Sequence, residues 1–325
     1  GEGWNSALRR SCAEIRVDRI ELASLSFEKR RLALCPARGR AIVNAGADGI
    51  RRGAGAPSLD LQGRRGETQI RLASGPVGFA YPGVMTAREI EVSLGPVETA
   101  SRFNVSGLEA RFGDDIAGTF TDADVMLAAV PMDLNKAEGN WRFADGRLTI
   151  NGADFTLVDR NASPRFEPLI ARDARLTLID NVIAAQAQLR NPASDRLVTT
   201  VDIRHDLQSG AGRADLDVPG LQLDGELQPG EISRLALGVI ANTKGIVTGT
   251  GRLDWAPNGT IKRTGSFSSD DIDLAAAFGP VEGASGTIEF VDLLNLTTAP
   301  GQKIRVASVN PGVEVFDGEV EFQLR

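Results

Sequence analysis

The stretch VNPGVEVFDGEVEFQLR, residues 309–325, decides the fold class. Its apolar residues alternate with polar ones on both sides of Asp317-Gly318: Val313, Val315, Val320, Phe322 and Leu324. Alternation with period two gives a strand one apolar and one polar face, and Asp-Gly favours a tight turn. The stretch therefore predicts a β-hairpin with one face in water. Because the chain stops on the last residue of such a strand, we expect it to be part of a longer protein.

The same alternation recurs along the chain in short runs bounded by Gly, Asn, Asp or Pro. Clear examples are TQIRLAS (68–74), ARLTLID (174–180) and LVTTVDIRH (197–205). Asp-Gly or Asn-Gly, which suit type I′ turns, occur at 48–49, 145–146, 151–152, 224–225, 258–259 and 317–318. The spacing predicts a mainly β chain of about 20 antiparallel strands.

Composition restricts the shape and the partners. The net charge of -7 lacks the basic surface that nucleic acids require, so no nucleic-acid partner is expected. No apolar run is long enough to span a bilayer. Aromatic residues make up only 5% of the chain, and open sheets beyond about ten strands curl. We therefore expect one elongated, curled sheet over residues 1–325 whose inner face is not filled by side chains.

One segment departs from the strand pattern. In GEISRLALGVIAN the apolar residues Ile232, Leu235, Ala236, Val239 and Ile240 recur at helical spacing. Pro229-Gly230 precedes the segment and Lys244-Gly245 follows it, as expected at helix ends. The pattern predicts one short amphipathic helix over residues 231–242, packed on the sheet or across its opening.

Candidate catalytic groups are few. His205 and Asp206 are adjacent, but neighbours in a strand point to opposite faces, so they do not form a dyad. Aspartates gather at 114–115, 122–124 and 270–273 without the ordered spacing of a calcium loop, which makes solvated turns the better interpretation. Two cysteines and one histidine do not make a zinc site. We expect no enzyme activity, no metal and no cofactor.

The two cysteines, Cys12 and Cys35, flank two strand-like segments. Two interpretations remain open from the residues. They are either buried free thiols or a disulfide between neighbouring strands in an oxidising compartment.

Three stretches carry a family resemblance: GVIANTKGIVTGTGRLDW (238–255), FGPVEGASGTIEFVDLLNLTTAPGQ (278–302) and VNPGVEVFDG (309–318). They resemble the YdbH branch of the AsmA-like, TamB-related bridge proteins of the Gram-negative envelope. The resemblance covers residues 130–325 and is weak over residues 1–115. It implies a U-shaped hydrophobic trough that conducts phospholipid between the inner and outer membranes.

The resemblance also implies a periplasmic location and an inner-membrane anchor in the full-length protein. Membrane contact would use segments absent from this chain, and a small outer-membrane lipoprotein would complete the bridge. A periplasmic location favours the disulfide between Cys12 and Cys35.

If the implied trough is present, the apolar positions of the alternating runs would line its lipid groove. These are Leu148, Ile150, Leu176, Leu178, Ile288, Phe290, Val313, Val315, Val320, Phe322 and Leu324. Two other functions remain possible at this stage. One is a structural envelope scaffold with a packed, dry interior, and the other is a binder of small polar ligands such as dicarboxylates.

Overall fold

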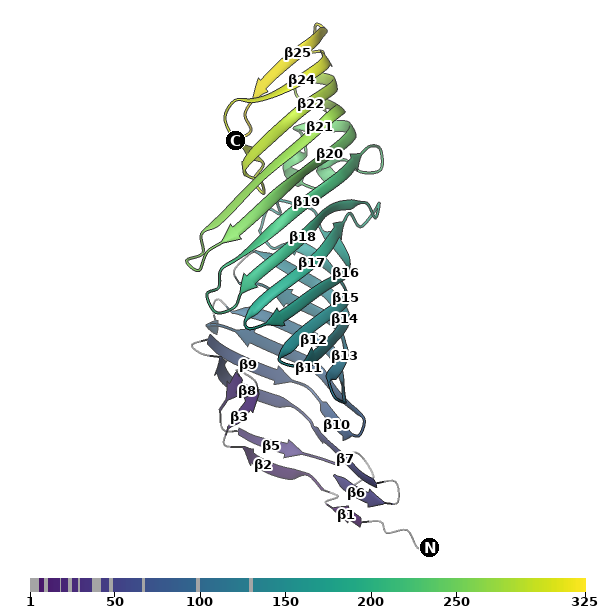
Figure 1. The fold of residues 1–325 in the computed structure, drawn as a ribbon, viewed down its shortest axis with the longest axis vertical. Helices are drawn as coiled ribbons and strands as arrows, with labels where there is room; N and C mark the ends of the chain where they lie inside the picture. Colours follow the sequence, from purple (N-terminus) through teal and green to yellow (C-terminus); the bar gives the residue numbers. More distant parts are fainter. Residues whose placement is uncertain are drawn as a thin grey trace. The chain divides into compact units, whose positions relative to one another are not determined.

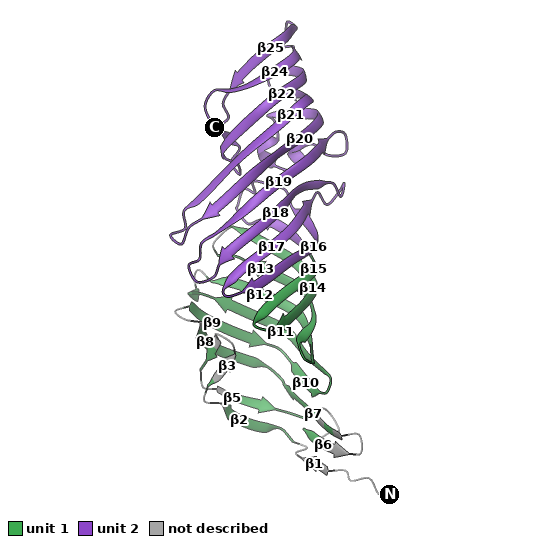
Figure 2. Cartoon of the chain, in the orientation of Figure 1, with its two compact units in different colours: residues 1–153 green, residues 154–325 purple. Residues whose placement is uncertain are grey.

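The protein is mainly β, as predicted. The computed structural model describes residues 6–8, 11–17, 19–22, 25–28, 30–36, 42–46, 49–65, 68–97, 100–128 and 131–325. These residues form antiparallel strands and short 3-10 turns but no α-helix. The chain divides into two compact units, residues 1–153 and 154–325, coloured green and purple in Figure 2.

Unit 1 begins with short strands and continues with longer ones. They are β1 (Ser6–Leu8), β2 (Ala13–Val17), β3 (Ile20–Leu22), β4 (Leu25–Phe27), β5 (Arg30–Leu34), β6 (Val43–Gly46), β7 (Gly49–Ala56), β8 (Leu59–Arg65), β9 (Thr68–Ser74), β10 (Val77–Tyr81), β11 (Val84–Leu94), β12 (Ser101–Phe112), β13 (Ile116–Met126) and β14 (Met132–Ala144). The boundary between the units falls inside β15 (Arg147–Asp159).

Within unit 1, strands β11 to β14 pair in chain order. The other edge of β11 pairs with β10 along one half and with β9 along the other, so the sheet forks there. One row of cross-strand neighbours is entirely apolar: Leu61, Leu72, Val92, Phe103, Val125 and Leu134. Because directly opposed residues share a face, unit 1 has a continuous apolar face.

The strands β2 and β5 form a separate two-stranded sheet. The structure joins Cys12, just before β2, to Cys35, just after β5, in a disulfide. The backbone of Cys35 also pairs with Gly55 of β7, with N···O distances of 2.7 and 2.8 Å in the two directions. The disulfide therefore ties β2 to a strand end that is itself attached to the larger sheet.

Unit 2 is built from strands that follow one another in chain order (Figure 1). They are β16 (Leu169–Ile179), β17 (Val182–Arg190), β18 (Leu197–Asp206), β19 (Gly212–Leu223), β20 (Ile240–Trp255), β21 (Ile261–Ala276), β22 (Gly279–Asp292), β23 (Thr297–Thr298), β24 (Gln302–Val309) and β25 (Val315–Phe322). Each pairs antiparallel with its neighbour, and β22 pairs with both β23 and β24.

The predicted helix over residues 231–242 is wrong. The segment forms two 3-10 turns, η2 (Pro229–Glu231) and η3 (Arg234–Ala236), and then enters β20 at Ile240. Ser233 and Leu237 have extended backbone and Gly238 has φ +78°, so neither 3-10 turn continues into an α-helix. The supposed apolar face is not buried either, since Leu235 is 41% exposed and Val239 is 44% exposed.

The expected hairpin turn at Asp317-Gly318 is also wrong. Residues 310–314 connect β24 to β25, and Asp317-Gly318 lies inside β25 with Asp317 at φ +50°. Asn151-Gly152 likewise lies inside β15, whereas the dipeptides at 145–146 and 258–259 do form turns. A residue that tolerates positive φ can serve a strand bulge as well as a turn, so the dipeptide alone does not separate the two. Asp48 lies outside the described residues.

Candidate functional site

Cross-strand registers give unit 2 two chemically different faces. The row Leu176, Ala185, Ile203, Ala214 and Leu253 runs across β16 to β20, each residue opposite the next. The neighbouring row, one residue along each strand, is polar: Gln186, Asp202, Asp215, Arg252 and Thr264. Since successive residues of a strand point to opposite sides, the first row belongs to an apolar face and the second to a polar face.

Three further rows extend this surface, which we call the apolar face of unit 2. One holds Leu178, Ile183, His205, Gly212, Trp255 and Ile261. The next holds Ala187, Val201, Leu216, Gly251, Gly265 and Phe290. The last holds Val218, Gly249, Phe267 and Ile288.

The apolar face continues onto the last two strands. Ser285, Arg305 and Glu319 are opposed to one another on the polar side. Their strand neighbours Ile304 and Val320 therefore point the other way, toward the apolar side. There Val281, Ala284 and Val306, each 2% exposed, form a buried cluster against which Ile304 and Val320 pack.

Much of the apolar face is only partly covered. Leu253 is 7% exposed and Val201 8% exposed, but Leu216, Phe267, Ile288 and Phe290 are half-buried although they project from the middle of strands. Phe267 and Phe290 meet edge to face with ring centroids 5.9 Å apart. The face therefore retains apolar surface that another hydrophobic molecule can cover.

The polar face is held by exposed ion pairs between neighbouring strands. Arg252 Nε lies 2.7 Å from Asp215 Oδ1, and Lys303 Nζ lies 2.8 Å from Glu319 Oε1. The hydrogen bond from Lys303 lowers the pKa of Glu319, and the same bond raises the pKa of Lys303. Pairs as exposed as these contribute little stability, so this face is built to remain in water.

The residues that alternation assigned to the groove fall in different places. Leu176, Leu178, Ile288, Phe290 and Val320 lie on the apolar face of unit 2. Phe322 opposes Gln302, two residues from the Ile304–Val320 pair, and so shares that face. Leu324 follows β25; its carbonyl oxygen accepts from the Thr298 backbone N–H at 3.1 Å, and its own N–H donates to Thr298 Oγ1 at 3.0 Å.

Two of the assigned residues are strongly exposed, and two belong to unit 1. Val313, 77% exposed, lies in the connection before β25, and Val315, 47% exposed, begins that strand. Leu148 and Ile150 lie on β15 and are half-buried.

His205 and Asp206 point in opposite directions, as the strand pattern predicts. His205 Nδ1 lies 3.2 Å from the indole nitrogen of Trp255 and 3.0 Å from the carbonyl oxygen of Ala211. Asp206 instead accepts hydrogen bonds from the backbone N–H groups of Ser209 and Gln208, which lower its pKa. His205 thus contacts Trp255 within one apolar row, and Asp206 stabilises the turn that follows β18.

Asp114 and Asp115 lie in the bend between β12 and β13, as the solvated-turn interpretation predicts, but Asp124 and Asp273 have a different role that sequence reasoning missed. Asp124 Oδ1 accepts a 3.0 Å hydrogen bond from the backbone N–H of Lys136, at φ +54° in the next strand. Asp273 Oδ1 does the same for Gly283, at 2.9 Å and φ +59°. Aspartate is depleted in strands, so aspartates inside alternating runs were the available signal for bulges. No cluster of metal-ligating side chains occurs in the described ranges.

Asp154 repeats this arrangement. Its Oδ1 accepts a 3.0 Å hydrogen bond from the backbone N–H of Asp173, which has φ +54° inside β16. A side-chain acceptor thereby satisfies an N–H that the bulge removes from the ladder.

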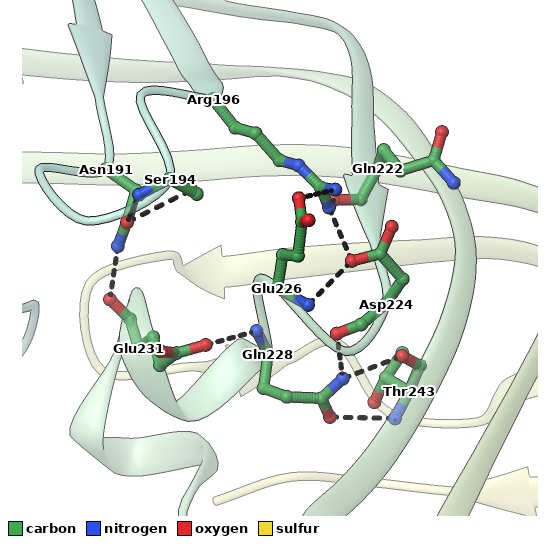
Figure 3. Close-up of polar contacts among 9 residues, drawn as sticks. All are labelled: Asn191, Ser194, Arg196, Gln222, Asp224, Glu226, Gln228, Glu231 and Thr243. Atoms are coloured by element: carbon green, nitrogen blue, oxygen red, sulfur yellow. Dashed lines mark hydrogen bonds and ion pairs between the residues drawn. The ribbon is translucent and has the colours of Figure 1, made fainter.

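A polar network fixes the connection between β19 and β20 (Figure 3). The Arg196 guanidinium lies 2.6 Å from Asp224 Oδ1 and 2.7 Å from Glu226 Oε2. The hydrogen bond from Arg196 lowers the pKa of Asp224. Gln228 closes the connection by accepting from Thr243 N and donating to Thr243 O, both at 2.9 Å. These contacts hold the segment that sequence predicted as a helix.

A buried ion pair lies at the end of β15. Asp159 has a fully buried side chain and accepts from Arg165 Nε at 2.7 Å and from the Arg165 backbone N–H at 2.9 Å. Burial would raise the pKa of Asp159, but the hydrogen bonds from Arg165 and Asn161 outweigh burial and hold the pKa below its ordinary value.

Among the described residues, no helix has the length and apolar character needed to cross a membrane. The family model described as "YdbH-like: Intermembrane phospholipid transport protein YdbH" matches residues 6–325. The chain belongs to the YdbH-like family. Neither a curated protein nor a solved structure matches the chain.

Membership in the YdbH-like family indicates what the chain does. The YdbH-like family transports phospholipid between membranes, which is not an enzymatic function. Phospholipid is the transported ligand, and transport between membranes places the protein in the cell envelope.

Proposed function

We propose that the apolar face of unit 2 is the surface along which phospholipid acyl chains move. The observation that carries this proposal is the series of apolar rows across β16 to β22, in which Leu216, Phe267, Ile288 and Phe290 are only half-buried. The polar face of the same strands keeps the protein in water through exposed ion pairs. A sheet with these two faces can shelter acyl chains on one side while the other remains hydrated.

Transport along the face requires contacts that are favourable but individually weak. Burial of apolar surface contributes about 25 cal/mol per Å². An acyl chain that slides from one row to the next exchanges one apolar contact for a similar one. No single residue then holds the lipid strongly, which suits a path more than a binding pocket.

We further propose that the sheet of residues 1–325 curls into a U-shaped trough with this surface inside. The low aromatic content supports this, because few large rings are present to fill an interior. The membership in an intermembrane transport family supports an inner-membrane anchor in the full-length protein and a small outer-membrane lipoprotein that completes the bridge. Leu148 and Ile150 would belong to the same lining.

Mass spectrometry of lipids bound to the full-length protein, purified without detergent, tests the lipid surface. The wild-type protein should carry phospholipid. Phe267→Asp should lose most of it, because a carboxylate on an apolar surface resists desolvation by several kcal/mol. Ser268→Asp, one residue away on the polar face, is the matched control and should retain the lipid. Wild-type protein free of phospholipid would contradict the proposal and favour a dry scaffold.

A further inference from the structure

The apolar face of unit 2 contains one ion pair among its rows. Arg263 opposes Leu253 on one side and Asp292 on the other, which extends the row of Leu176, Ile203 and Leu253. These are the two charged side chains in the four rows of β16 to β22. Charges on an apolar surface are costly unless they are paired and hydrogen-bonded, so the cost of this pair depends on how fully Arg263 and Asp292 are bonded.

Arg263 makes fewer hydrogen bonds in this ion pair than Asp292 does. Arg263 Nη1 lies 3.3 Å from Asp292 Oδ2, and their side chains are 21% and 31% exposed. Asp292 has other donors, since Asn295 donates from its backbone N–H at 3.2 Å and from Nδ2 at 2.9 Å. Asp292 therefore stays hydrogen-bonded if Arg263 turns away. A guanidinium has five N–H donors, and only one of Arg263's has an acceptor in the described part of the chain.

The rows on the two sides of Arg263 differ in composition. The row on the side of the β20–β21 turn contains Trp255 and Ile261, and the indole N–H of Trp255 reaches His205. Tryptophan with one apolar and one polar end is typical of water–lipid boundaries.

The row on the other side of Arg263 contains Gly251, Gly265 and Phe290. Leu293 covers the two glycines: a Cβ on Gly251 would lie 2.7 Å from Leu293 Cδ2, and a Cβ on Gly265 would lie 3.3 Å from it. Across three adjacent rows the surface therefore changes from Trp255 and Ile261, to Arg263, to the apolar side chains of Phe290 and Leu293.

We propose that Arg263 binds the phosphate of a phospholipid headgroup while the acyl chains lie on the apolar rows beyond it. This assignment rests on the proposed function and adds where the headgroup sits. An amphiphile needs an anion site and an apolar surface at adjacent positions, and Arg263 with Phe290 and Ile288 supplies that order. Guanidinium is well suited to the task, because its planar donors can bind two phosphate oxygens at once.

The same sheet provides a matched arginine. Arg252 is paired with Asp215 at 2.7 Å and opposes Thr264, the strand neighbour of Arg263, but it lies on the polar face. Arg252 and Arg263 thus come from paired strands and differ in the face they occupy. The substitutions Arg263→Gln and Arg252→Gln remove the same charge from the two faces.

Two photoreactive phosphatidylethanolamines test the assignment on the full-length protein. One carries the reactive group on the headgroup and the other at the end of an acyl chain, and labelled peptides are mapped by mass spectrometry. The headgroup probe should label residues 255–261 and the acyl probe residues 288–290. Arg263→Gln should lower headgroup labelling about tenfold, because a hydrogen bond to a charged group is lost. Arg263→Lys should retain part of it.

The controls separate the possible failures. Acyl labelling should be unchanged in Arg263→Gln, and both probes should label Arg252→Gln like the wild type. Equal headgroup labelling in the two glutamine variants would overturn the assignment while leaving the lipid surface intact. Absence of acyl labelling at residues 288–290 in the wild type would instead contradict the proposed function. If Arg263→Gln weakens binding of inorganic phosphate but leaves headgroup labelling unchanged, Arg263 is a site for free anions and the assignment is wrong.

Discussion

The two faces of unit 2 use the same strands for opposite purposes. On the polar face, neighbours such as Asp215 and Arg252 pair in solvent with their side chains 35% and 54% exposed. On the apolar face, the adjacent row holds Ala214 and Leu253, which are both 7% exposed. The comparison teaches that burial, and not charge pairing, provides the stability of this sheet. The half-buried apolar residues of the same face are the ones that we propose contact lipid.

The largest effect is expected when a charge is placed on the apolar face. Ile203→Asp should abolish phospholipid transport, because an acyl chain cannot pass a desolvated carboxylate without a penalty of several kcal/mol. The measurement is complementation of an envelope defect in cells lacking related transporters, at matched protein levels. Arg204→Asp, the next residue along β18, changes the charge by more but lies on the polar face and should complement. Full complementation by Ile203→Asp would remove the functional distinction between the faces.

The next largest effect is a difference in stability between removing a buried ion pair and removing an exposed one. Asp159→Asn should lower the free energy of unfolding by about 3 kcal/mol, because it leaves the Arg165 charge buried without a carboxylate. Asp215→Asn, on the polar face, should lower it by less than about 1 kcal/mol. Urea unfolding followed by circular dichroism compares the two variants. Equal losses would mean that exposed pairs stabilise the sheet as much as buried ones.

Asp159 also predicts a pH dependence. Its pKa in the folded protein lies below the ordinary 3.8. A carboxylate with a depressed pKa stabilises the folded state fully above the unfolded value, and this contribution is lost as pH falls through the folded value. The wild type should therefore lose stability on acidification below about pH 4. The difference in unfolding free energy between the wild type and Asp159→Asn should shrink over that range, and a constant difference would contradict the assignment.

A smaller effect separates covered from open parts of the apolar surface. Val306→Ala should destabilise by about 2 kcal/mol, because it removes two methyl groups from a buried cluster and leaves a cavity. Val315→Ala makes the same change at a side chain that is 47% exposed and should cost well under half as much. The midpoints of urea unfolding give the loss of stability in both variants. We predict a larger loss for Val306→Ala than for Val315→Ala.

The smallest effect is expected on the polar face. Glu321 is 64% exposed and lies 3.8 Å from Lys303. Glu321→Lys should change neither transport nor stability measurably, although it reverses a charge. A transport defect in this variant, at normal protein levels, would show that the polar face takes part in lipid passage.

Sequence alone predicted the strands well because period two is a local signal. Runs such as ARLTLID and LVTTVDIRH alternate cleanly and form β16 and β18. Cross-strand partners are not local, so the registers that join Leu176 to Ile203 and Leu253 could not be derived from the sequence. Bulges at Asp173 and Gly283 add residues within strands and change which residues share a face.

The errors have a common physical cause. Ile232, Leu235 and Val239 have helical spacing, but the extended backbone at Ser233 and Leu237 divides the segment into two 3-10 turns. Asp317-Gly318 has the composition of a turn, yet it lies inside β25. Both patterns report which backbone angles a residue tolerates. They do not report which neighbouring strand or side chain selects among those angles.

The charged residues of the apolar face were equally hidden. Arg263 and Asp292 are far apart in sequence, and only the pairing of β21 with β22 brings them together on one side of the sheet. Alternation places Arg263 in phase with Ile261 and Phe267 on β21, but it does not show that Asp292 lies opposite.

The most direct test is a crosslinking scan along β22. A photoreactive amino acid is placed in turn at positions 287, 288, 289 and 290 of the full-length protein in cells, and crosslinked phospholipid is detected. Thr287 and Glu289 lie on the polar face, and Ile288 and Phe290 lie on the apolar face. The account predicts lipid adducts at 288 and 290 and none at 287 and 289. Adducts of equal strength at all four positions, or only at 287 and 289, would contradict it.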